Sequence, residues 1–446
     1  MIELNFLKDK KIGVLGLGKT GCATVESLNL SGSKVFCFDD NSPTSSDVSC
    51  VKNLDALIVS PGIKFSWPKM HDIVKEARNN LVPIYSDLDL FLMAIKNKAE
   101  TEKKIIAITG TNGKSTTTAL IWHILKECGY KVDVGGNFGV PVLSMDSDVD
   151  IYVVEVSSYQ LDLSFNPCFD ISILLNITPD HLERHGGMFG YVAAKEKVFL
   201  DSGLCVISQD SSVLLEITKY LEHIHKNVIK ISQYNSHIAD VFWNNNELYD
   251  RRNNKIICRN TQILSGLHNQ QNIAAAYAAL KHIGISDNDF AVSLMSFCGL
   301  EHRQEILSTD WTNAKIINDS KATNAESTEQ AFLRFLNYDI LWIAGGIPKE
   351  GGISSLNKYF RYIKQAFLIG KAEDEFYDIL LKHGVICRKC TTLDVAVEAA
   401  IKASKDYSNS VVLFSPACAS FDQFKNFEDR GDKFKKIIKE YKNGAS

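Results

Sequence analysis

Short runs of apolar, mostly β-branched residues recur along this chain and are separated by longer stretches with the residue spacing of helices. A run of about four to eight such residues between turn-forming residues is typical of a buried strand in a parallel sheet. This alternation predicts an α/β protein. The runs that we interpret as strands lie at residues 11–17, 34–38, 56–60, 105–108, 151–156, 171–175, 316–318, 341–344, 366–369 and 411–414.

These strands fall into three groups, which suggests three domains. Residues 95–104 are polar and charged without apolar periodicity, as in a linker, and we expect a second boundary near Gly299. A chain of 446 residues suits three domains at about 150 residues each. We expect Rossmann-like domains at residues 1–97 and 300–446, and a central ATP-binding domain with a phosphate loop at residues 98–299. Residues 204–258 give weaker strand signals and no functional interpretation.

A glycine-rich stretch after the run at 105–108 has the pattern of a phosphate-binding loop. Its glycines let backbone N–H groups surround phosphate oxygens, and the N-terminus of the following helix adds partial positive charge. Lys114 is placed to neutralise the terminal phosphates of ATP, and the Ser115 hydroxyl to bind Mg²⁺. Ile108 stands where the common motif has its first glycine, which points away from typical kinases and GTPases. The loop consists of Gly110, Thr111, Asn112, Gly113, Lys114, Ser115 and Thr116.

A second glycine motif, at residues 16–21, follows the first predicted strand. Together with Asp39 after the next strand, it matches the fingerprint of dinucleotide-binding domains. On its own the motif suggests NAD, with Asp39 on a ribose hydroxyl. The same loop accepts any nucleotide that carries a pyrophosphate, including a nucleotide-sugar, so the sequence leaves the base open. Residues 60–62, Ser-Pro-Gly, are either a further ligand loop or a structural turn.

Three polar residues stand out at the expected carboxyl edge of the central sheet. Glu155 lies within an apolar strand, where a buried carboxylate is costly unless a cation meets it. A Mg²⁺ bound by both Ser115 and Glu155 would offset this cost. The alternative is that the Glu155 side chain is exposed at the edge of the strand. His181 follows another strand in a loop, where most histidines are simply exposed. Lys195 shares a helical segment with Lys197, and the two lysines also fit a solvated helix face.

The composition mainly excludes classes of protein. A formal net charge of −4 gives no basic field, so we expect no nucleic-acid partner. No apolar run approaches the ~18–20 residues of a membrane span, and the N-terminus lacks the apolar core of a signal peptide. We therefore expect a cytoplasmic protein with no membrane partner. Among the 11 cysteines, Cys387 and Cys390 form one C-x-x-C pair, which we interpret as incidental thiols and not as a zinc or redox site.

Several motifs, in their order along the chain, resemble those of the Mur ligases, the ATP-dependent ligases of peptidoglycan synthesis. The resemblance covers essentially the whole chain. NDSKATN and the long C-terminal motif are the most specific, and they are similar to those of the family members that use D-glutamate. The motifs are TGTNGKST, NITPDHLERHG, YVAAK, SGLHNQQN, GLEHR, NDSKATN and SPACASFDQFKNFEDRG.

The resemblance implies a monomeric ligase in which ATP phosphorylates the carboxylate of UDP-N-acetylmuramoyl-L-alanine. The amine of D-glutamate then attacks the acyl phosphate, and the amide, ADP and phosphate result. It further implies that Lys114 stabilises the transferring phosphoryl group and that Ser115 and Glu155 hold one Mg²⁺. His181 and Lys195 would hold a second Mg²⁺. Because an ammonium cannot bind Mg²⁺, this role requires a CO₂-derived carbamate on Lys195.

The resemblance assigns further residues to the three ligands. ATP would be bound by Asn269, Asn272, Arg303 and Asp319, although simple helix capping is an equal alternative for Asn269. The UDP-sugar would be bound by Lys19, Thr20, Asp39, Asn137 and Ser157. D-Glutamate would be bound by Lys321, Thr323, Lys349, Ser420 and Phe427, with Lys321 also catalytic.

Two departures from the family pattern and two rival functions accompany this interpretation. Residues 345–352 lack the aspartate that the family often has after its lysine, which weakens the assignment of Lys349. Asn41 stands where some relatives have an arginine near the uridine diphosphate. Within the class, the alternative is a Mur ligase that adds another amino acid. From a different class, an NAD(P)-dependent oxidoreductase built on residues 16–21 is the rival, and it leaves the phosphate loop unexplained.

Overall fold

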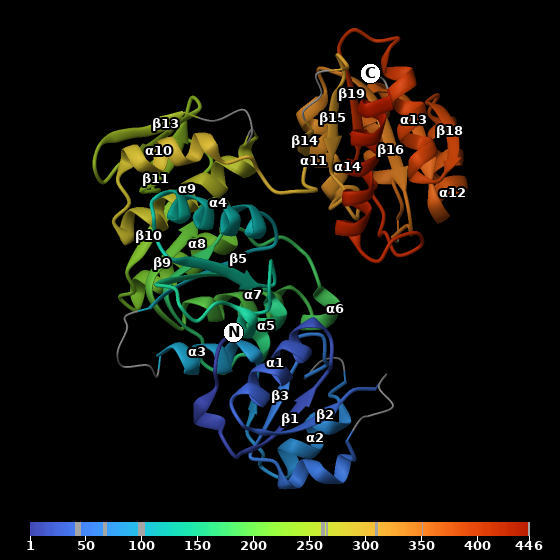
Figure 1. Ribbon diagram of the computed structural model, residues 1–446. Helices are drawn as coiled ribbons and strands as arrows, with labels where there is room; N and C mark the ends of the chain where they lie inside the picture. Colours follow the sequence, from blue (N-terminus) through green and yellow to red (C-terminus); the bar gives the residue numbers. More distant parts are fainter. Residues whose placement is uncertain are drawn as a thin grey trace. The chain divides into compact units, whose positions relative to one another are not determined.

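The apolar runs form strands that are covered on both faces, and the computed structural model arranges them in three sheets (Figure 1). It describes residues 1–40, 46–65, 69–96, 103–259, 264, 266–307, 311–349 and 351–444. The chain divides into two compact units, Met1–Phe297 and Cys298–Ser446. The first unit contains two of the sheets and the second unit contains one, so the α/β class expected from the sequence is confirmed.

The N-terminal sheet is parallel, with the strand order β2-β1-β3-β4. Its first strand ends two residues earlier than predicted, because Gly16 turns the chain with a φ of 89°. The first helix begins at Lys19, within the glycine motif. The elements are β1 (Lys11–Leu15), α1 (Lys19–Leu30), β2 (Lys34–Phe38), β3 (Ala56–Val59), α2 (Asp72–Asn79), β4 (Ile84–Tyr85) and α3 (Asp87–Lys96).

The central sheet has the strand order β13-β12-β11-β10-β9-β8-β5-β7-β6. The pairs from β6 to β11 are parallel, and β12 and β13 extend the sheet in antiparallel fashion. Because β5 lies between β7 and β8, the loops at the carboxyl ends of these strands meet. The strands are β5 (Lys104–Thr109), β6 (Val132–Gly136), β7 (Ile151–Glu155), β8 (Cys168–Leu174), β9 (Asp201–Ser208), β10 (Val228–Ser232), β11 (Val241–Asn244), β12 (Glu247–Asp250) and β13 (Lys255–Arg259).

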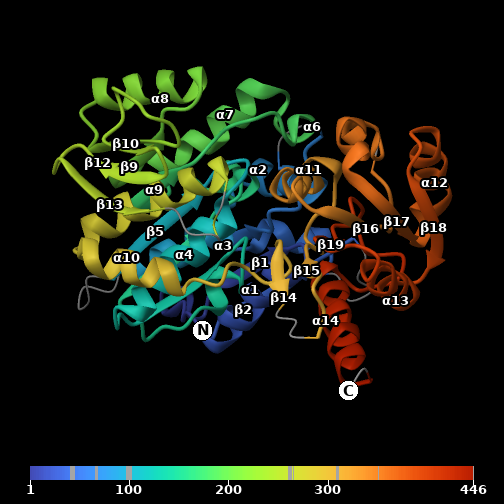
Figure 2. The same cartoon turned by 90° about the horizontal axis from the view of Figure 1, so that it is seen from above.

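Helices cover this sheet, as the view from above shows (Figure 2). The alanine-rich helix α9 is buried from Gln270 to Leu280 and packs against α4, since small side chains allow a close approach. It starts at Leu267. The helices are α4 (Lys114–Glu127), α5 (Ser158–Leu163), α6 (Leu182–His185), α7 (Met188–Glu196), α8 (Ser212–His223), α9 (Leu267–Ile283) and α10 (Asp287–Ser296).

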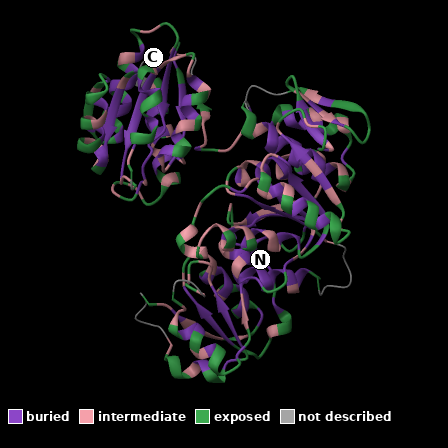
Figure 3. Cartoon of the chain, turned by 180° about the vertical axis from the view of Figure 1, so that it is seen from behind, coloured by how far each residue is buried: buried purple, intermediate pink, exposed green. Residues whose placement is uncertain are grey.

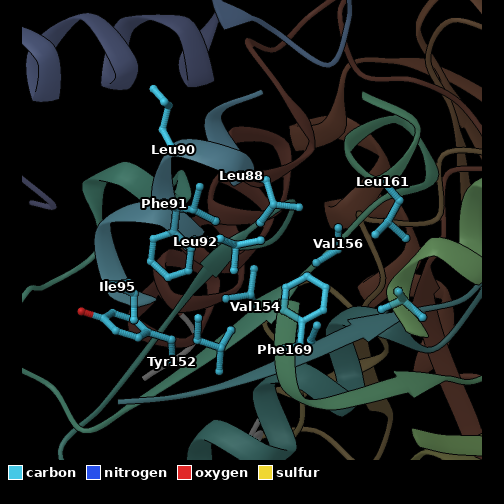
Figure 4. Close-up of a cluster of buried hydrophobic side chains, with 14 of the residues drawn as sticks. Leu88, Leu90, Phe91, Leu92, Ile95, Tyr152, Val154, Val156, Leu161 and Phe169 are labelled. Carbon is cyan, nitrogen blue, oxygen red and sulfur yellow. The ribbon is translucent and has the colours of Figure 1, made fainter. Parts of the chain in front are cut away.

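Helix α3 joins the two sheets of the first unit through one continuous core. Its apolar residues pack on the central strand β7, with the Phe91 and Tyr152 rings edge-to-face at 5.1 Å (Figure 4). The same cluster of buried residues includes Ile12 and Val14 of β1. Most strands are buried, and exposed residues lie mainly on helices and loops (Figure 3). Contact with the central sheet thus holds the N-terminal sheet within the first unit.

Asp89 fastens α3 to the chain after α5. This buried carboxylate accepts hydrogen bonds from Ser86 through its N–H and hydroxyl, both at 2.8 Å, from the Ser164 hydroxyl at 2.5 Å and from the Phe165 N–H at 3.1 Å. Asp89→Ala leaves these donors without their acceptor, so we expect the free energy of unfolding to fall by about 2–3 kcal/mol. Urea denaturation measures this change.

The matched control is Asp148→Ala. Asp148 is an exposed carboxylate of the same unit that pairs with Lys131 at 3.3 Å, and its loss should change the free energy of unfolding by no more than about 0.5 kcal/mol. Equal losses in the two variants would contradict the fastening role of Asp89.

The second unit is built on one sheet with the order β14-β15-β19-β16-β17-β18, in which only the β14–β15 pair is antiparallel. Among the described residues no helix is long and apolar enough to cross a membrane. All 11 cysteines carry free thiols. The elements of this unit are β14 (Glu305–Leu307), β15 (Lys315–Asn318), α11 (Ala325–Phe335), β16 (Asp339–Gly345), β17 (Ile363–Ile369), α12 (Glu373–Lys382), β18 (Ile386–Thr391), α13 (Leu393–Ser404), β19 (Ser410–Phe414) and α14 (Phe427–Gly444).

Candidate active site

The phosphate loop, residues 110–116, connects β5 to α4 as the glycine spacing predicts. Gly113 caps α4 in the left-handed region with a φ of 85°. A side chain there is excluded for a second reason, because an added Cβ would lie 2.3 Å from Oδ1 of Asn272. The loop is therefore closed against α9 and its backbone lies at the N-terminus of α4, where N–H groups attract anions.

Lys114 folds back over the loop that it belongs to. Its Nζ donates to the carbonyl oxygens of Gly110 and Thr111, both at 2.9 Å, and the side chain lines a cavity at the carboxyl edge of the sheet. An ammonium held by two carbonyls at a helix N-terminus is positioned to attract a phosphate group.

Glu155 is buried at the end of β7, so exposure at a strand edge is the wrong alternative. Its side chain is 2% exposed, and Oε1 accepts from Nδ2 of Asn137 at 2.6 Å. Its Oε2 is buried with no hydrogen-bond partner. A buried carboxylate oxygen left without a donor suits a cation, which would offset the cost of burying its charge.

Lys195 is also buried, which excludes the solvated helix face. Its Nζ donates to the Gly110 carbonyl at 2.8 Å and lies 4.9 Å from the centre of the Tyr191 ring. Burial and, to a smaller extent, the charge of Lys114 lower the pKa of Lys195 to about 7, although the charges of Asp180 and Glu155 act in the opposite direction. Near neutral pH a large share of Lys195 is therefore an unprotonated amine, the form that is nucleophilic.

Lys197, two residues later, has a different role. Its Nζ donates to the carbonyl oxygens of Asp162 and Ser164 at 2.8 and 3.2 Å, so it fastens the helix to the end of α5. The two lysines thus have different surroundings, since Lys195 lines the cavity and Lys197 binds backbone carbonyls.

His181 lies at the mouth of the cavity, just before α6. Its backbone is in the left-handed region with a φ of 52°, and its Nε2 lies 3.4 Å from a carboxylate oxygen of Asp180. Its ring packs against the Tyr159 ring, with 5.0 Å between centres. The histidine is partly exposed, so a ligand in the cavity can reach it.

The cavity has a volume of about 630 Å³ and joins the two sheets of the first unit. It brings together eight of the residues predicted from the sequence. Three were predicted for phosphoryl transfer or metal binding, and five for binding a nucleotide-sugar. Residues 60–62 also line it, as the ligand-loop interpretation expects. The eight are Lys114, His181, Lys195, Lys19, Thr20, Asp39, Asn137 and Ser157.

The loop at residues 16–21 is tightly wound beside this cavity. A Cβ on Gly21 would lie 1.9 Å from the carbonyl oxygen of Gly16, so the close approach requires glycine. Asp39 accepts from the N–H of Leu17 at 2.7 Å and thereby orders the loop, and Lys19 donates to the Gly139 carbonyl at 2.8 Å. Both side chains still face the cavity.

Asn269 and Asn272 lie on α9 behind the phosphate loop. The capping alternative for Asn269 is wrong, because Gly266 is the N-cap of α9 and Asn269 lies inside the helix. Its Oδ1 accepts from Nδ2 of Asn272 at 3.1 Å. The Asn272 Oδ1 is buried without a hydrogen-bond partner close to Gly113.

In the second unit, loops that follow β15 and β19 contain most of the remaining predicted residues. The Nζ of Lys321 lies 3.7 Å from the centre of the Phe427 ring. Asp319 accepts from the Gln304 N–H at 3.1 Å and the Ser415 hydroxyl at 2.7 Å, and burial raises the pKa of its carboxyl to about 7. Ser420 is buried, Arg303 and Thr323 are partly buried, and Lys349 is exposed. Asn41 lies outside the described residues.

The structure adds residues that the sequence did not single out. Tyr191 bonds to Thr111 of the phosphate loop at 3.0 Å between their hydroxyl oxygens. Asn176 bonds to both backbone groups of Asn112, at 2.8 Å to its nitrogen and 3.1 Å to its oxygen. The position of Asn176 directly after a strand of the central sheet was the available signal. Among the described residues no group of three or more His, Cys, Asp or Glu forms a closed metal site.

Residues 108–280 match the family model of the Mur ligase middle domain. The UDP-N-acetylmuramoylalanine–D-glutamate ligase of Paramagnetospirillum magneticum is 40% identical, with 100% of each chain covered. The enzyme of the same name from Wolbachia pipientis wMel is 36% identical, with 97% of each covered.

Two solved structures share the fold at low identity. UDP-N-acetylmuramate-alanine ligase MurC from Thermotoga maritima has a TM-score of 0.63 at 20% identity, with 97% of this chain and 100% of that chain covered. MurF from Acinetobacter baumannii has a TM-score of 0.61 at 17% identity, with 91% and 95% covered. Given the full-length identity above 30%, the chain belongs to the family of the UDP-N-acetylmuramoylalanine–D-glutamate ligases, within the Mur ligases.

Proposed function

We propose that this protein joins D-glutamate to UDP-N-acetylmuramoyl-L-alanine and converts ATP to ADP and phosphate. The observation that carries the proposal is the shared cavity, into which the loop at residues 16–21, Lys114 and Lys195 all open. A ligand held by the first loop thus has its far end beside the phosphate loop. This arrangement suits a nucleotide-linked carboxylate that is to be phosphorylated.

The UDP-sugar would occupy the side of the cavity formed by the N-terminal sheet. The backbone N–H groups of residues 16–21 and the N-terminus of α1 would bind the pyrophosphate. Lys19, Thr20 and Asp39 line this side, and Asn137 and Ser157 line the side toward the central sheet. The rival NAD(P)-dependent oxidoreductase needs the first loop alone and has no use for the second.

ATP would be bound with its phosphates in the loop at residues 110–116, with Asn269 and Asn272 behind it. Lys114 would follow the phosphoryl group as it transfers to the carboxylate, because negative charge gathers there in the transition state. Ser115 and Glu155 fit one Mg²⁺ together with phosphate oxygens and water, and the unpartnered Oε2 of Glu155 supports this. The metal supplies charge neutralisation when bound.

Lys195 would carry a carbamate, and with His181 it would hold a second Mg²⁺. The unprotonated amine of Lys195 adds to CO₂, forming an N–C bond and releasing one proton. The burial of Lys195 against the Gly110 carbonyl supports this assignment, since an ammonium is costly at such a position.

The second unit would bind D-glutamate, a dianion that requires cations and hydrogen-bond donors. Lys321 supplies the cation and rests on the ring of Phe427. Thr323, Lys349 and Ser420 would complete the site, and Arg303 and Asp319 would contact ATP. We accordingly propose functional domains at residues 1–97, 98–299 and 300–446 for the UDP-sugar, ATP and D-glutamate.

An assay of phosphate release tests the proposal, with each of the three substrates omitted in turn. We expect release only when ATP, UDP-N-acetylmuramoyl-L-alanine and D-glutamate are all present with Mg²⁺. Release with L-lysine or diaminopimelate in place of D-glutamate would identify another amino-acid ligase and contradict the assignment of the second unit. Binding of NADH seen by fluorescence, without phosphate release, would favour the oxidoreductase.

A further inference from the structure

A chain of hydrogen bonds runs from the middle of the central sheet to the phosphate loop. The Asp210 Oδ2 accepts from Nε2 of Gln271 at 3.0 Å. The Oε1 of Gln271 accepts from Nδ2 of Asn176 at 2.8 Å. Asn176 then holds Asn112 by its N–H at 2.8 Å and its carbonyl at 3.1 Å. We call Asp210, Gln271 and Asn176 the amide relay.

The carboxylate at one end gives the amide relay a direction. An ionised carboxylate only accepts hydrogen bonds, so Gln271 must turn its NH₂ group toward Asp210. Its oxygen then faces Asn176, which must present its own NH₂ group to it. The oxygen of Asn176 is left facing the N–H of Asn112. Each amide is thus oriented by the preceding one, although amide orientations are ambiguous where no such anchor exists.

Asp210 is a firm anchor. Its Oδ1 accepts from the hydroxyl of Ser232 at 2.6 Å, and its Oδ2 also accepts from the hydroxyl of Ser208 at 2.9 Å and the N–H of Gln233 at 3.2 Å. These residues end β9 and β10, so the relay connects the ends of β10, β9 and β8 to the loop after β5. Gln271 is only 4% exposed and does not line the cavity, and its hydrogen bond to Asn176 connects it to the loop.

We propose that the amide relay sets the shape of the phosphate loop, and that Gln271 is a positioning residue for ATP. The inference rests on the proposed function, because the loop must bind phosphate for its shape to matter. By fixing both backbone groups of Asn112, the relay holds the middle of the loop in the conformation that presents N–H groups to phosphate oxygens. No residue of the relay itself touches the cavity.

The test compares Gln271→Met with Gln270→Met. Methionine keeps the volume of glutamine and removes its hydrogen bonds. Gln270 is the adjacent residue of α9, is 7% exposed, and bonds through its side chain to Asn246 at 3.3 Å, away from the loop. We expect Gln271→Met to weaken the binding of Mg-ADP about 10-fold by calorimetry and to raise the KM for ATP similarly. The KM for the UDP-substrate should stay within about two-fold of wild type, and Gln270→Met should leave all three unchanged.

Two further measurements separate positioning from general destabilisation. Hydrogen exchange at the Asn112 amide should accelerate in Gln271→Met and not in Gln270→Met, with no nucleotide added. Asp210→Asn removes the carboxylate that orients the Gln271 amide and should weaken Mg-ADP binding, as Gln271→Met does. A variant that carries both Asp210→Asn and Gln271→Met should bind Mg-ADP no more weakly than Gln271→Met alone, since both changes break the same chain of hydrogen bonds.

The failure of this inference differs from the failure of the proposed function. If the wild type binds Mg-ADP and Gln271→Met binds it as tightly as Gln270→Met does, the positioning role is overturned. If the wild type does not bind Mg-ADP, the proposed function fails. Unchanged exchange at Asn112 in both Gln271→Met and Asp210→Asn would overturn the relay whatever the activity.

Discussion

Replacing Lys114 with alanine is expected to lower phosphate release at least about 100-fold, because a positioned cation at the transferring phosphoryl group is commonly worth ~3 kcal/mol or more. The side chain donates to two carbonyls of its own loop and lines the cavity, so its removal takes away the cation that we propose for the reacting phosphate. The measurement is the steady-state rate of phosphate release with all three substrates saturating.

The matched control for Lys114 is Lys126→Ala. Lys126 lies in the last turn of the same helix and is exposed. Its Nζ lies 5.0 Å from the centre of the Trp122 ring. Its replacement should leave the rate within about two-fold of wild type, since it is remote from the loop. Full turnover by Lys114→Ala would exclude the phosphate loop as the site of phosphoryl transfer.

Lys195→Ala should also lower the rate by on the order of 100-fold or more, because it removes both the carbamate and the metal ligand that we propose. Rigorous removal of CO₂ and bicarbonate should inactivate the wild type in the same way, and returning bicarbonate should restore it. With isotopically labelled bicarbonate, the wild type should show a carbamate carbon signal in the NMR spectrum that Lys195→Ala lacks.

Lys197→Ala is the control for this variant. Lys197 is two residues away and bonds to the carbonyls of Asp162 and Ser164, so its loss should lower stability slightly and leave the carbamate signal intact. Wild-type activity that survives the removal of CO₂ would contradict carbamylation, and Lys195→Ala at full rate would contradict any role of this lysine in the reaction.

The strands and the two glycine loops were predictable because their signals are local. A β-branched run followed by Gly110 and Gly113 specifies a strand, a tight turn and a helix N-terminus within a few residues. The alanine-rich part of α9, Ile273 to Leu280, likewise has a local helical signal, since alanine is the best helix former. Strands β12 and β13 gave weak signals because they lie at the end of the central sheet and are partly exposed.

The sequence by itself determined which residues carry charge or a phosphate-binding backbone, and the order of the motifs pointed to the family. Only the tertiary structure decided which of these residues are buried and which share a cavity. Glu155 and Lys195 looked like residues with ordinary exposed alternatives, and both are buried beside the phosphate loop. Gln271 lies in the motif SGLHNQQN but nothing in the sequence assigned it a role, although it bonds to both Asp210 and Asn176. The reason is physical: burial, pKa and hydrogen-bond partners depend on elements that are distant in the chain, and local patterns of polarity contain no information about those contacts.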